Sequence, residues 1–257
     1  MEVIDQLQRK ISLPNVLKRI ISLVPSQTEL LVDLGLEENL VGITKFCVHP
    51  QYLRKTKTVV GGTKQVKLEK IKALDPDIIL CNKEENTQKM VAELEEIAPV
   101  HVSDIVKIED AFELMHQYGD IFQKEALVKT MVNSIRDKIA VLQEKLLDKP
   151  VKKVAYFIWK KPLMVAGKDT FIDELLKLNK FENVFKESRY PETTLEELKA
   201  KNPDVILLSS EPYPFKEKHK EYFSELNIEI QLVDGEYFSW YGSSLVGAID
   251  YFKTLRS

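Results

Sequence analysis

The sequence has few cysteines, no long apolar run and no excess of basic charge. Its two cysteines, Cys47 and Cys81, are too few for the disulfide framework of a small secreted domain, and we expect free thiols. No apolar run approaches the roughly 20 residues of a transmembrane helix, so we predict a protein that does not span a membrane. The net charge of −3 and the pI near 5.9 argue against a nucleic-acid partner.

A secretory signal and the common catalytic motifs are also missing. The first residues, MEVIDQLQRKISLPNV, contain no uninterrupted apolar core of about 7–15 residues. We therefore expect a cytoplasmic protein as the sequence is written, or a periplasmic or surface-anchored one if a signal has been removed. No P-loop, H-E-x-x-H, G-x-S-x-G or strand-borne G-x-G-x-x-G occurs. This favours a binding protein with no catalytic residues and no intrinsic cofactor.

One segment occurs twice. Residues 68–80, LEKIKALDPDIIL, and residues 195–207, LEELKAKNPDVIL, are identical at eight of thirteen positions without a gap. Each copy predicts a short amphipathic helix, a turn at Asp/Asn-Pro-Asp and a buried strand. Any α/β protein contains such units, but so many identities favour a duplication that produced two similar lobes.

Strand and helix patterns alternate around both copies, which predicts mainly parallel sheets. Ser26 is the predicted N-cap of a helix over 27–34, with Glu29 as its capping-box partner, and Thr193–Glu196 is a second predicted capping box. The predicted strands cover residues 19–24, 40–43, 78–80, 100–102, 154–158, 164–166, 205–208 and 230–233. The other predicted helices cover residues 86–97, 170–178, 215–226 and 244–255.

Residues 108–147 lack this alternation and are rich in helix-forming residues, with no proline and one glycine, Gly119. We predict a break at Gly119 and one long helix over 124–147, which at 1.5 Å per residue spans about 36 Å. Its apolar residues recur at spacings of three and four. They are Val128, Met131, Ile135, Ile139, Leu142 and Leu146.

We therefore predict an α/β fold with two Rossmann-like lobes, each with a mainly parallel sheet, bridged by one long α-helix. The predicted domains are an N-terminal lobe (19–105), a helical segment with the bridging helix (106–149) and a C-terminal lobe (150–257). Ligands of open α/β sheets bind beyond the carboxyl ends of the strands, so we expect the ligand in a cleft between the lobes.

The loops after the predicted strands are rich in aromatic residues and suit a bulky, partly apolar ligand. For any single ring, ordinary packing is the alternative explanation. His49 is the candidate for an axial contact with a chelated metal, the alternative being a turn residue bonded to backbone. The aromatic candidates are Phe46, Trp159, Tyr190, Tyr237, Trp240 and Tyr241.

Glu69 and Glu196 occupy the same position in the two repeat copies, in the first turn of each helix. Stabilisation of the helix macrodipole explains an acidic residue there. A matched acidic pair, one in each lobe, would also grip two arginines of a dimeric partner.

Several of these stretches together resemble a known family. They are RIISLVPSQTELLVDLGLEENLVGIT, VGGTKQVKLEKIKALDPDIIL, the long helical segment and NPDVILL. The family is the helical-backbone (class III, TroA-like) substrate-binding proteins, which deliver cobalamin, ferric siderophores or haem to ABC importers. Its cobalamin-binding members are the most similar, and the resemblance covers about residues 19–256. It implies a monomer that binds a metal–organic chelate.

The resemblance also implies roles for single residues. Glu69 and Glu196 match the glutamates that dock onto the arginines of an ABC permease dimer. Phe46, His49 and Tyr190 match cleft positions, and Trp159 falls on a loop that lines the cleft. Thr63 and Lys64 stand where cobalamin-binding members have a tryptophan.

The acid and arginine of the last cleft loop in cobalamin-binding members are also replaced, near residues 236–244, so corrinoid, haem and siderophore all stay open as ligands. Two alternatives use the same cleft: a cytoplasmic chelatase or cofactor-processing enzyme, and a cytoplasmic corrinoid carrier or sensor. The ligand-binding prediction comprises Phe46, His49, Thr63, Lys64, Trp159, Tyr190, Tyr237, Trp240 and Tyr241.

Overall fold

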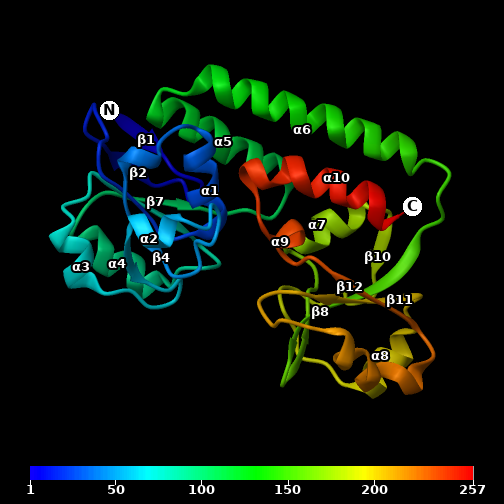
Figure 1. Cartoon of the computed structure of the whole chain (residues 1–257). Coiled ribbons are helices and arrows are strands. Elements are labelled where there is room, and N and C mark those ends of the chain that lie inside the picture. Colours follow the sequence, from blue (N-terminus) through cyan, green and yellow to red (C-terminus); the bar gives the residue numbers. More distant parts are fainter. Residues whose placement is uncertain (257) are drawn as a thin grey trace. The chain divides into compact units, whose positions relative to one another are not determined.

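The computed structural model describes residues 1–256 and shows an α/β fold (Figure 1). The chain divides into two compact units, each with its own sheet. Unit 1 consists of Met1–Ile105, Glu109–Ser134 and Tyr241–Ser244. Unit 2 consists of Val106–Ile108, Ile135–Trp240 and the residues from Leu245 onward. No helix in the described residues is long and apolar enough to cross a membrane.

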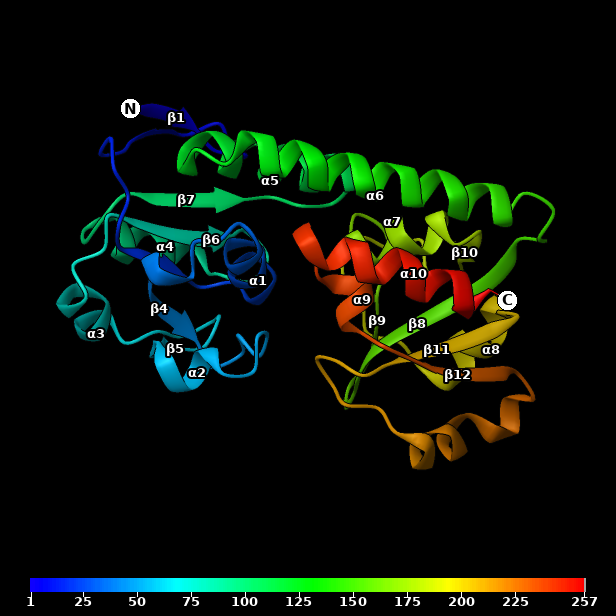
Figure 2. The same ribbon diagram turned by 45° about the horizontal axis from the view of Figure 1, so that its top comes forward.

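Unit 1 is built on a parallel five-stranded sheet in the order β5-β4-β3-β6-β7 (Figure 2). Its strands are mostly buried, as expected of a parallel sheet covered on both faces. The strands are β3 (Ile20–Ser22), β4 (Leu40–Thr44), β5 (Thr58–Gly61), β6 (Ile78–Asn82) and β7 (Val100–Ser103). The helices are α1 (Pro25–Asp33), η1 (Glu37–Asn39), α2 (Leu53–Thr56), α3 (Leu68–Ala73), α4 (Gln88–Glu95) and most of α5 (Ile108–Phe122).

Unit 2 has a parallel path β10-β8-β11-β12, and β9 pairs with β8 in the antiparallel direction. The segment predicted as an α-helix over 215–226 is instead a 3₁₀-helix, η2 (Glu217–Leu226). The strands are β8 (Lys152–Lys160), β9 (Leu163–Val165), β10 (Phe181–Asn183), β11 (Val205–Ser209) and β12 (Glu229–Val233). The α-helices are α7 (Phe171–Leu178), α8 (Leu195–Lys201), α9 (Glu236–Ser239) and α10 (Leu245–Leu255).

The two repeat copies fold alike, as helix α3 with strand β6 and as helix α8 with strand β11. Asp75 and Asn202 end these helices with left-handed backbones, at φ +43° and +45°. Asp77 then accepts hydrogen bonds from the backbone N–H groups of Lys18 and Arg19 at 2.7 and 2.8 Å. In unit 2 Asp204 accepts from the N–H of Lys153 at 2.6 Å. The last residue of each Asp/Asn-Pro-Asp turn therefore ties the repeat strand to the first parallel strand of its own unit.

The long helix is α6 (Glu125–Lys145), with 21 residues. Its residues up to Ser134 belong to unit 1 and those from Ile135 to unit 2. The predicted break at Gly119 is wrong, because α5 continues through Gly119 to Phe122 and the chain turns at Gln123, at φ +57°. Gly119 instead permits a close approach: a Cβ there would lie 3.3 Å from Cα of Glu125 and from Cγ2 of Val128.

Two predicted capping boxes are wrong by one or two residues. Pro25 occupies the first turn of α1 and Val24 is its N-cap, with no side-chain cap, so Ser26 lies inside the helix. Proline suits that position because it has no N–H to satisfy there. In unit 2 the N-cap of α8 is Thr194, whose hydroxyl accepts from the N–H of Glu197 at 3.1 Å.

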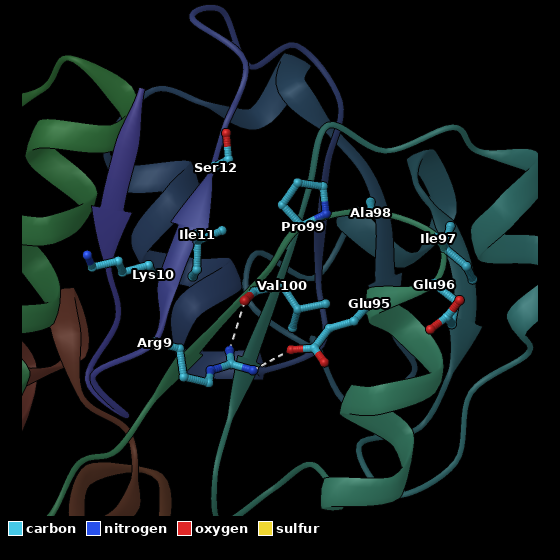
Figure 3. Close-up of a pocket in the computed structure, with 10 residues that line it drawn as sticks. All are labelled: Arg9, Lys10, Ile11, Ser12, Glu95, Glu96, Ile97, Ala98, Pro99 and Val100. Atoms are coloured by element: carbon cyan, nitrogen blue, oxygen red, sulfur yellow. Dashed lines mark hydrogen bonds and ion pairs between the residues drawn. The ribbon is translucent and has the colours of Figure 1, made fainter.

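A hairpin of β1 (Glu2–Ile4) and β2 (Lys10–Ser12) precedes the sheet of unit 1. Three side chains of its turn bond to the backbone along the outer edge of β7, an edge strand. Asp5 accepts from the N–H of Val102 at 3.1 Å, Gln6 from that of Asp104 at 3.1 Å, and Arg9 donates to the carbonyl of Val100 at 2.9 Å (Figure 3). The hairpin turn thereby occupies backbone positions that another strand would otherwise use.

Candidate functional site

The carboxyl ends of the unit 1 strands carry a buried polar network centred on Gln27 of α1. The amide nitrogen of Gln27 donates to Ser103 Oγ at 2.7 Å and to the Tyr241 hydroxyl at 3.1 Å. Its amide oxygen accepts from the Tyr118 hydroxyl at 2.7 Å, and Asn82 donates to Ser103 Oγ at 3.0 Å. Burial raises the pKa of Tyr118 and of Tyr241, so both phenols are neutral at physiological pH.

Phe46, in the loop after β4, is an exposed ring of unit 1, with 48% of its surface accessible. Lys45 places its ammonium 4.9 Å from the ring centroid. A Cβ at Gly62 would lie 3.2 Å from the ring, so the ring rests on the loop that follows β5. The structure therefore brings Phe46 to the loop that carries Thr63, which is half-buried.

The same loop is joined to the loop that follows β6. The carbonyl of Thr63 accepts from the side chain of Asn86 at 2.8 Å, and Lys64 donates to the carbonyl of Glu84. Thr63 and Lys64 follow β5, whose neighbour in the sheet is β4, and so lie at the same end of the sheet as Phe46. This part of the predicted site forms one continuous surface of unit 1.

Both thiols are free, as predicted, and both are buried. Cys47 Sγ lies 3.1 Å from Thr28 Oγ1 and 3.3 Å from Thr44 Oγ1, and burial raises its pKa. His49 is half-buried in the same loop, before the cis peptide bond to Pro50. Within residues 1–256 no group of three or more His, Cys, Asp or Glu side chains is placed to hold a metal ion.

In unit 2 Trp159 lies near the end of β8 and belongs to an aromatic cluster that the sequence did not indicate. Its ring centroid is 5.7 Å from that of Tyr213, which is 4.7 Å from Phe215 and 5.5 Å from His219. Tyr213 and Phe215 follow β11, so parallel strand pairing brings them to the end of β8. The pattern Tyr-Pro-Phe a few residues after a buried strand was the available signal.

Tyr190 lies in the loop before α8 and is half-buried, with the Arg189 guanidinium 6.0 Å from its ring centroid. Tyr237 stacks on Tyr251 of α10 at 5.1 Å between centroids. The structure does not bring Tyr237 to Trp159 through any ring contact within the described residues. Tyr190 and Tyr237 are both half-buried, and Tyr237 is in addition stacked on a ring of α10.

Trp240 and Tyr241 are both buried, at 7% and 5% exposure. The indole N–H of Trp240 donates to Glu211 Oε1 at 3.1 Å, and Ser239 donates to the same oxygen. Burial raises the pKa of Glu211 above its usual value, the Ser239 bond opposes this, and the negative charge of Glu236 adds to it. Sequence reasoning missed Glu211, although an acidic residue directly after a buried strand was a usable signal.

Glu69 and Glu196 are both exposed and lie in the first turns of α3 and α8, as their place in the repeat predicted. Among the residues that the structure describes, neither carboxylate has an ion-pair or hydrogen-bond partner. The neighbouring Glu197, by contrast, accepts from Thr193 at 3.1 Å and pairs with Lys201 at 3.7 Å. The two equivalent glutamates are therefore accessible to a partner.

A surface groove of about 390 Å³ lies elsewhere on unit 1 (Figure 3). It is lined by Arg9–Ser12 of the hairpin and by Glu95–Val100, where α4 ends and β7 begins. Arg9 forms ion pairs there with Glu95 and Asp5 and donates a hydrogen bond to the carbonyl of Val100. Because the groove is at the amino-terminal end of β7, it includes none of the predicted site residues.

Two relatives match most of the chain. A substrate-binding lipoprotein of an ABC transporter from Bacillus subtilis, itself uncharacterized, is 26% identical over 220 residues, covering 82% of this chain and 69% of the relative. The vitamin B12-binding protein of Yersinia pestis is 28% identical over 208 residues, covering 75% and 69%.

Solved structures with the same fold include the periplasmic vitamin B12-binding protein of Vibrio cholerae. It has a TM-score of 0.79 at 19% identity and covers 93% of this chain and 96% of its own. A periplasmic heme-binding protein of Pseudomonas aeruginosa has a TM-score of 0.80 at 21% identity and covers 94% and 93%. The family model described as periplasmic binding protein matches residues 20–226, and the chain belongs to this family.

Proposed function

We propose that this chain is the substrate-binding protein of an ABC importer and that its cargo is a metal–organic chelate: a corrinoid, haem or a ferric siderophore. The observation that carries the proposal is the family match over residues 20–226. Relatives described as binding vitamin B12 or heme support the chelate, and one described as an ABC transporter lipoprotein supports the importer.

The place of action follows from the same relatives. They are described as a lipoprotein or as periplasmic proteins, and they give no support to the cytoplasmic location expected from the first residues. They likewise give none to a cytoplasmic enzyme, carrier or sensor. We assign this chain to the outer side of the cytoplasmic membrane, as a binding protein without catalysis, with the chelate as cargo and not as a resident cofactor.

Side chains at the carboxyl ends of the strands would contact the chelate. Phe46, Trp159 and Tyr190 offer partly accessible aromatic faces, and a flat conjugated ligand stacks on such faces. Thr63 and Lys64 add polar groups beside Phe46, and His49 is assigned an axial contact to the chelated metal. Tyr237, Trp240 and Tyr241 would each support the fold of their own unit, because their rings are packed on another ring or hydrogen-bonded to another side chain.

The test is an equilibrium titration of the purified protein with cyanocobalamin, haemin, ferrichrome and ferric enterobactin, followed by absorbance and thermal melting. We expect at least one chelate to bind and to raise the melting temperature. The variants Phe46→Ala and Trp159→Ala should weaken that binding, whereas Tyr52→Ala, which removes another exposed ring of unit 1, should not. Failure of all four chelates to bind would refute the proposed function.

A further inference from the structure

The ring of Trp159 is fixed in place although 38% of its surface is exposed. Its indole N–H donates to the carbonyl of Lys161 at 3.0 Å, and Tyr213 meets it in an edge-on contact. An exposed aromatic ring that is held on two sides loses little conformational freedom when a ligand stacks on it. Trp159 is therefore a pre-oriented platform for a flat group.

Several lysines lie near the aromatic cluster to which Trp159 belongs. Lys160 follows Trp159 directly, and its ammonium lies 5.6 Å from the ring centroid of Tyr222. Burial is the largest cause of the lowered pKa of His219, and the positive charges of Lys160, Lys218 and Lys216 lower it further. These three lysines therefore lie within electrostatic reach of the aromatic cluster.

These lysines are not neutralised by the protein itself. Across residues 1–256, none of Lys160, Lys161, Lys216 and Lys218 has an ion-pair partner, whereas the nearby Lys220 pairs with Glu217 at 3.0 Å. The whole chain carries a net charge of −3, so this positive surface is a local feature of unit 2. We call it the basic aromatic patch: Trp159, Lys160, Lys161, Tyr213, Lys216 and Lys218.

We infer that the basic aromatic patch binds the anionic, conjugated part of the cargo, which makes the cargo a negatively charged chelate whose carboxylate or phenolate oxygens sit beside an aromatic ring. This inference rests on the proposed function and narrows it. Lysine ammoniums form charge-assisted hydrogen bonds with such oxygens, and the indole face accepts the ring. A corrinoid or a ferric hydroxamate without net charge would gain nothing from the unpaired lysines.

The test compares four probes on the intact protein: ferric enterobactin and haemin as anionic chelates, and ferrichrome and cyanocobalamin as chelates without net charge. The patch variant combines Lys160→Met, Lys216→Met and Lys218→Met. Its control combines Lys72→Met, Lys129→Met and Lys199→Met, which removes the same charge from exposed positions outside the patch. Both variants are first shown to melt at the temperature of the unchanged protein.

We expect an anionic probe to bind at least about tenfold more tightly than either uncharged probe, and the patch variant to lose about tenfold or more of that affinity. The control should stay within about twofold, and added salt should weaken binding only where the patch is intact. Quenching of Trp159, made the only tryptophan by Trp240→Phe, should report the bound anionic probe.

Equal losses in the patch variant and the control, or tighter binding of an uncharged probe, would overturn the inference and leave the proposed function standing. Binding of no probe to the unchanged protein would overturn both.

Discussion

At the scale of single residues, Asp77 and Asp204 show how the duplicated segment works. Each follows the proline of its turn and accepts hydrogen bonds from backbone N–H groups at the start of the neighbouring parallel strand. Each also donates its own N–H to that strand, to the carbonyls of Arg19 and Lys153 at 2.8 and 2.9 Å. This explains why Asp is shared by both copies of the segment.

Replacing Asp77 by alanine should therefore destabilise the protein. Two backbone N–H groups lose their acceptor, and we expect the free energy of unfolding to fall by about 1–2 kcal/mol in urea. Asp33→Ala, at the exposed end of α1, is the matched control and should change it by less than about 0.5 kcal/mol. Equal effects of the two changes would show that the hydrogen bonds from Lys18 and Arg19 to Asp77 do not stabilise the protein.

We expect the stability of the protein to depend on pH through the carboxyl of Glu211. Burial and the negative charge of Glu236 raise its folded-state pKa above the usual 4.5, with the hydrogen bond from Ser239 opposing the shift. A carboxyl with a raised folded-state pKa stabilises the fold fully below its unfolded pKa, and that contribution is lost as the pH rises through the folded value.

Glu211→Gln keeps an acceptor oxygen for the indole of Trp240 and stays neutral at every pH. The variant should therefore match the unchanged protein near about pH 4 and become the more stable of the two as the pH rises towards neutrality. Urea unfolding at a series of pH values measures this. A stability difference that does not depend on pH would show that ionisation of Glu211 carries no cost.

We expect charge changes at Glu69 and Glu196 to reduce transport of the chelate without changing its binding. We propose that each carboxylate meets an arginine of the permease, so charge reversal of both to lysine should reduce uptake by an importer about tenfold or more. Chelate affinity should change by less than about twofold. The control pair Glu96→Lys and Glu144→Lys, also exposed and one in each unit, should transport normally.

At the scale of elements, the hairpin β1–β2 shows how an edge strand is protected. Asp5 is fully buried and accepts from the N–H groups of Leu7, Arg9 and Val102, as well as from the Arg9 side chain. Edge strands with open backbone groups tend to pair with other chains. The turn of this hairpin covers the edge of β7 with side chains instead of a further strand.

Asp5→Ala should consequently lower the free energy of unfolding by about 2–4 kcal/mol, since the half-buried Arg9 side chain and three backbone donors lose one acceptor. It should also promote self-association, seen as a larger species in analytical ultracentrifugation at high protein concentration. Glu2→Ala, on exposed surface of β1, is the control. A monomeric, equally stable Asp5→Ala variant would show that the edge does not need this cover.

Element boundaries show what the sequence could and could not predict. The repeat, the alternation of strands and helices and the long helix were predicted because periodicity and turn residues determine them locally. The break at Gly119 was wrong because this glycine serves a contact with Val128 rather than a helix end. Packing across a turn leaves no local pattern in the sequence.

The candidate site shows the same limit. Parallel pairing of β8 with β11 brings Tyr213 to Trp159. This contact cannot be predicted from the spacing of the two residues in the sequence. Tyr241 was predicted at the ligand because it stands in an aromatic loop, yet its hydroxyl is hydrogen-bonded to Gln27 inside unit 1. Composition predicts an aromatic-lined site, whereas it does not predict the orientation of each ring.

At the scale of the whole molecule, α6 begins in unit 1 and ends in unit 2, and residues 241–244 belong to unit 1 although the chain on both sides of them belongs to unit 2. Separate melting would require α6 to break within its hydrogen-bonded length, so we expect a single cooperative transition. Both tryptophans, Trp159 and Trp240, lie in unit 2, so their fluorescence follows that unit alone. Far-ultraviolet circular dichroism follows both units, and the two curves should coincide in urea.

The chain returns to unit 1 at Tyr241–Ser244, and this limits how the protein can be divided into fragments. Unit 1 is not a continuous stretch: η3 (Gly242–Ser244) packs on α1, and Tyr241 completes the network around Gln27. A fragment ending at Ser134 would lack this piece, and a fragment starting at Ile135 would carry it with no place to insert. Expressed alone, the first half would therefore have a cavity where Tyr241–Ser244 pack, and the second half would carry Tyr241 without its partner Gln27.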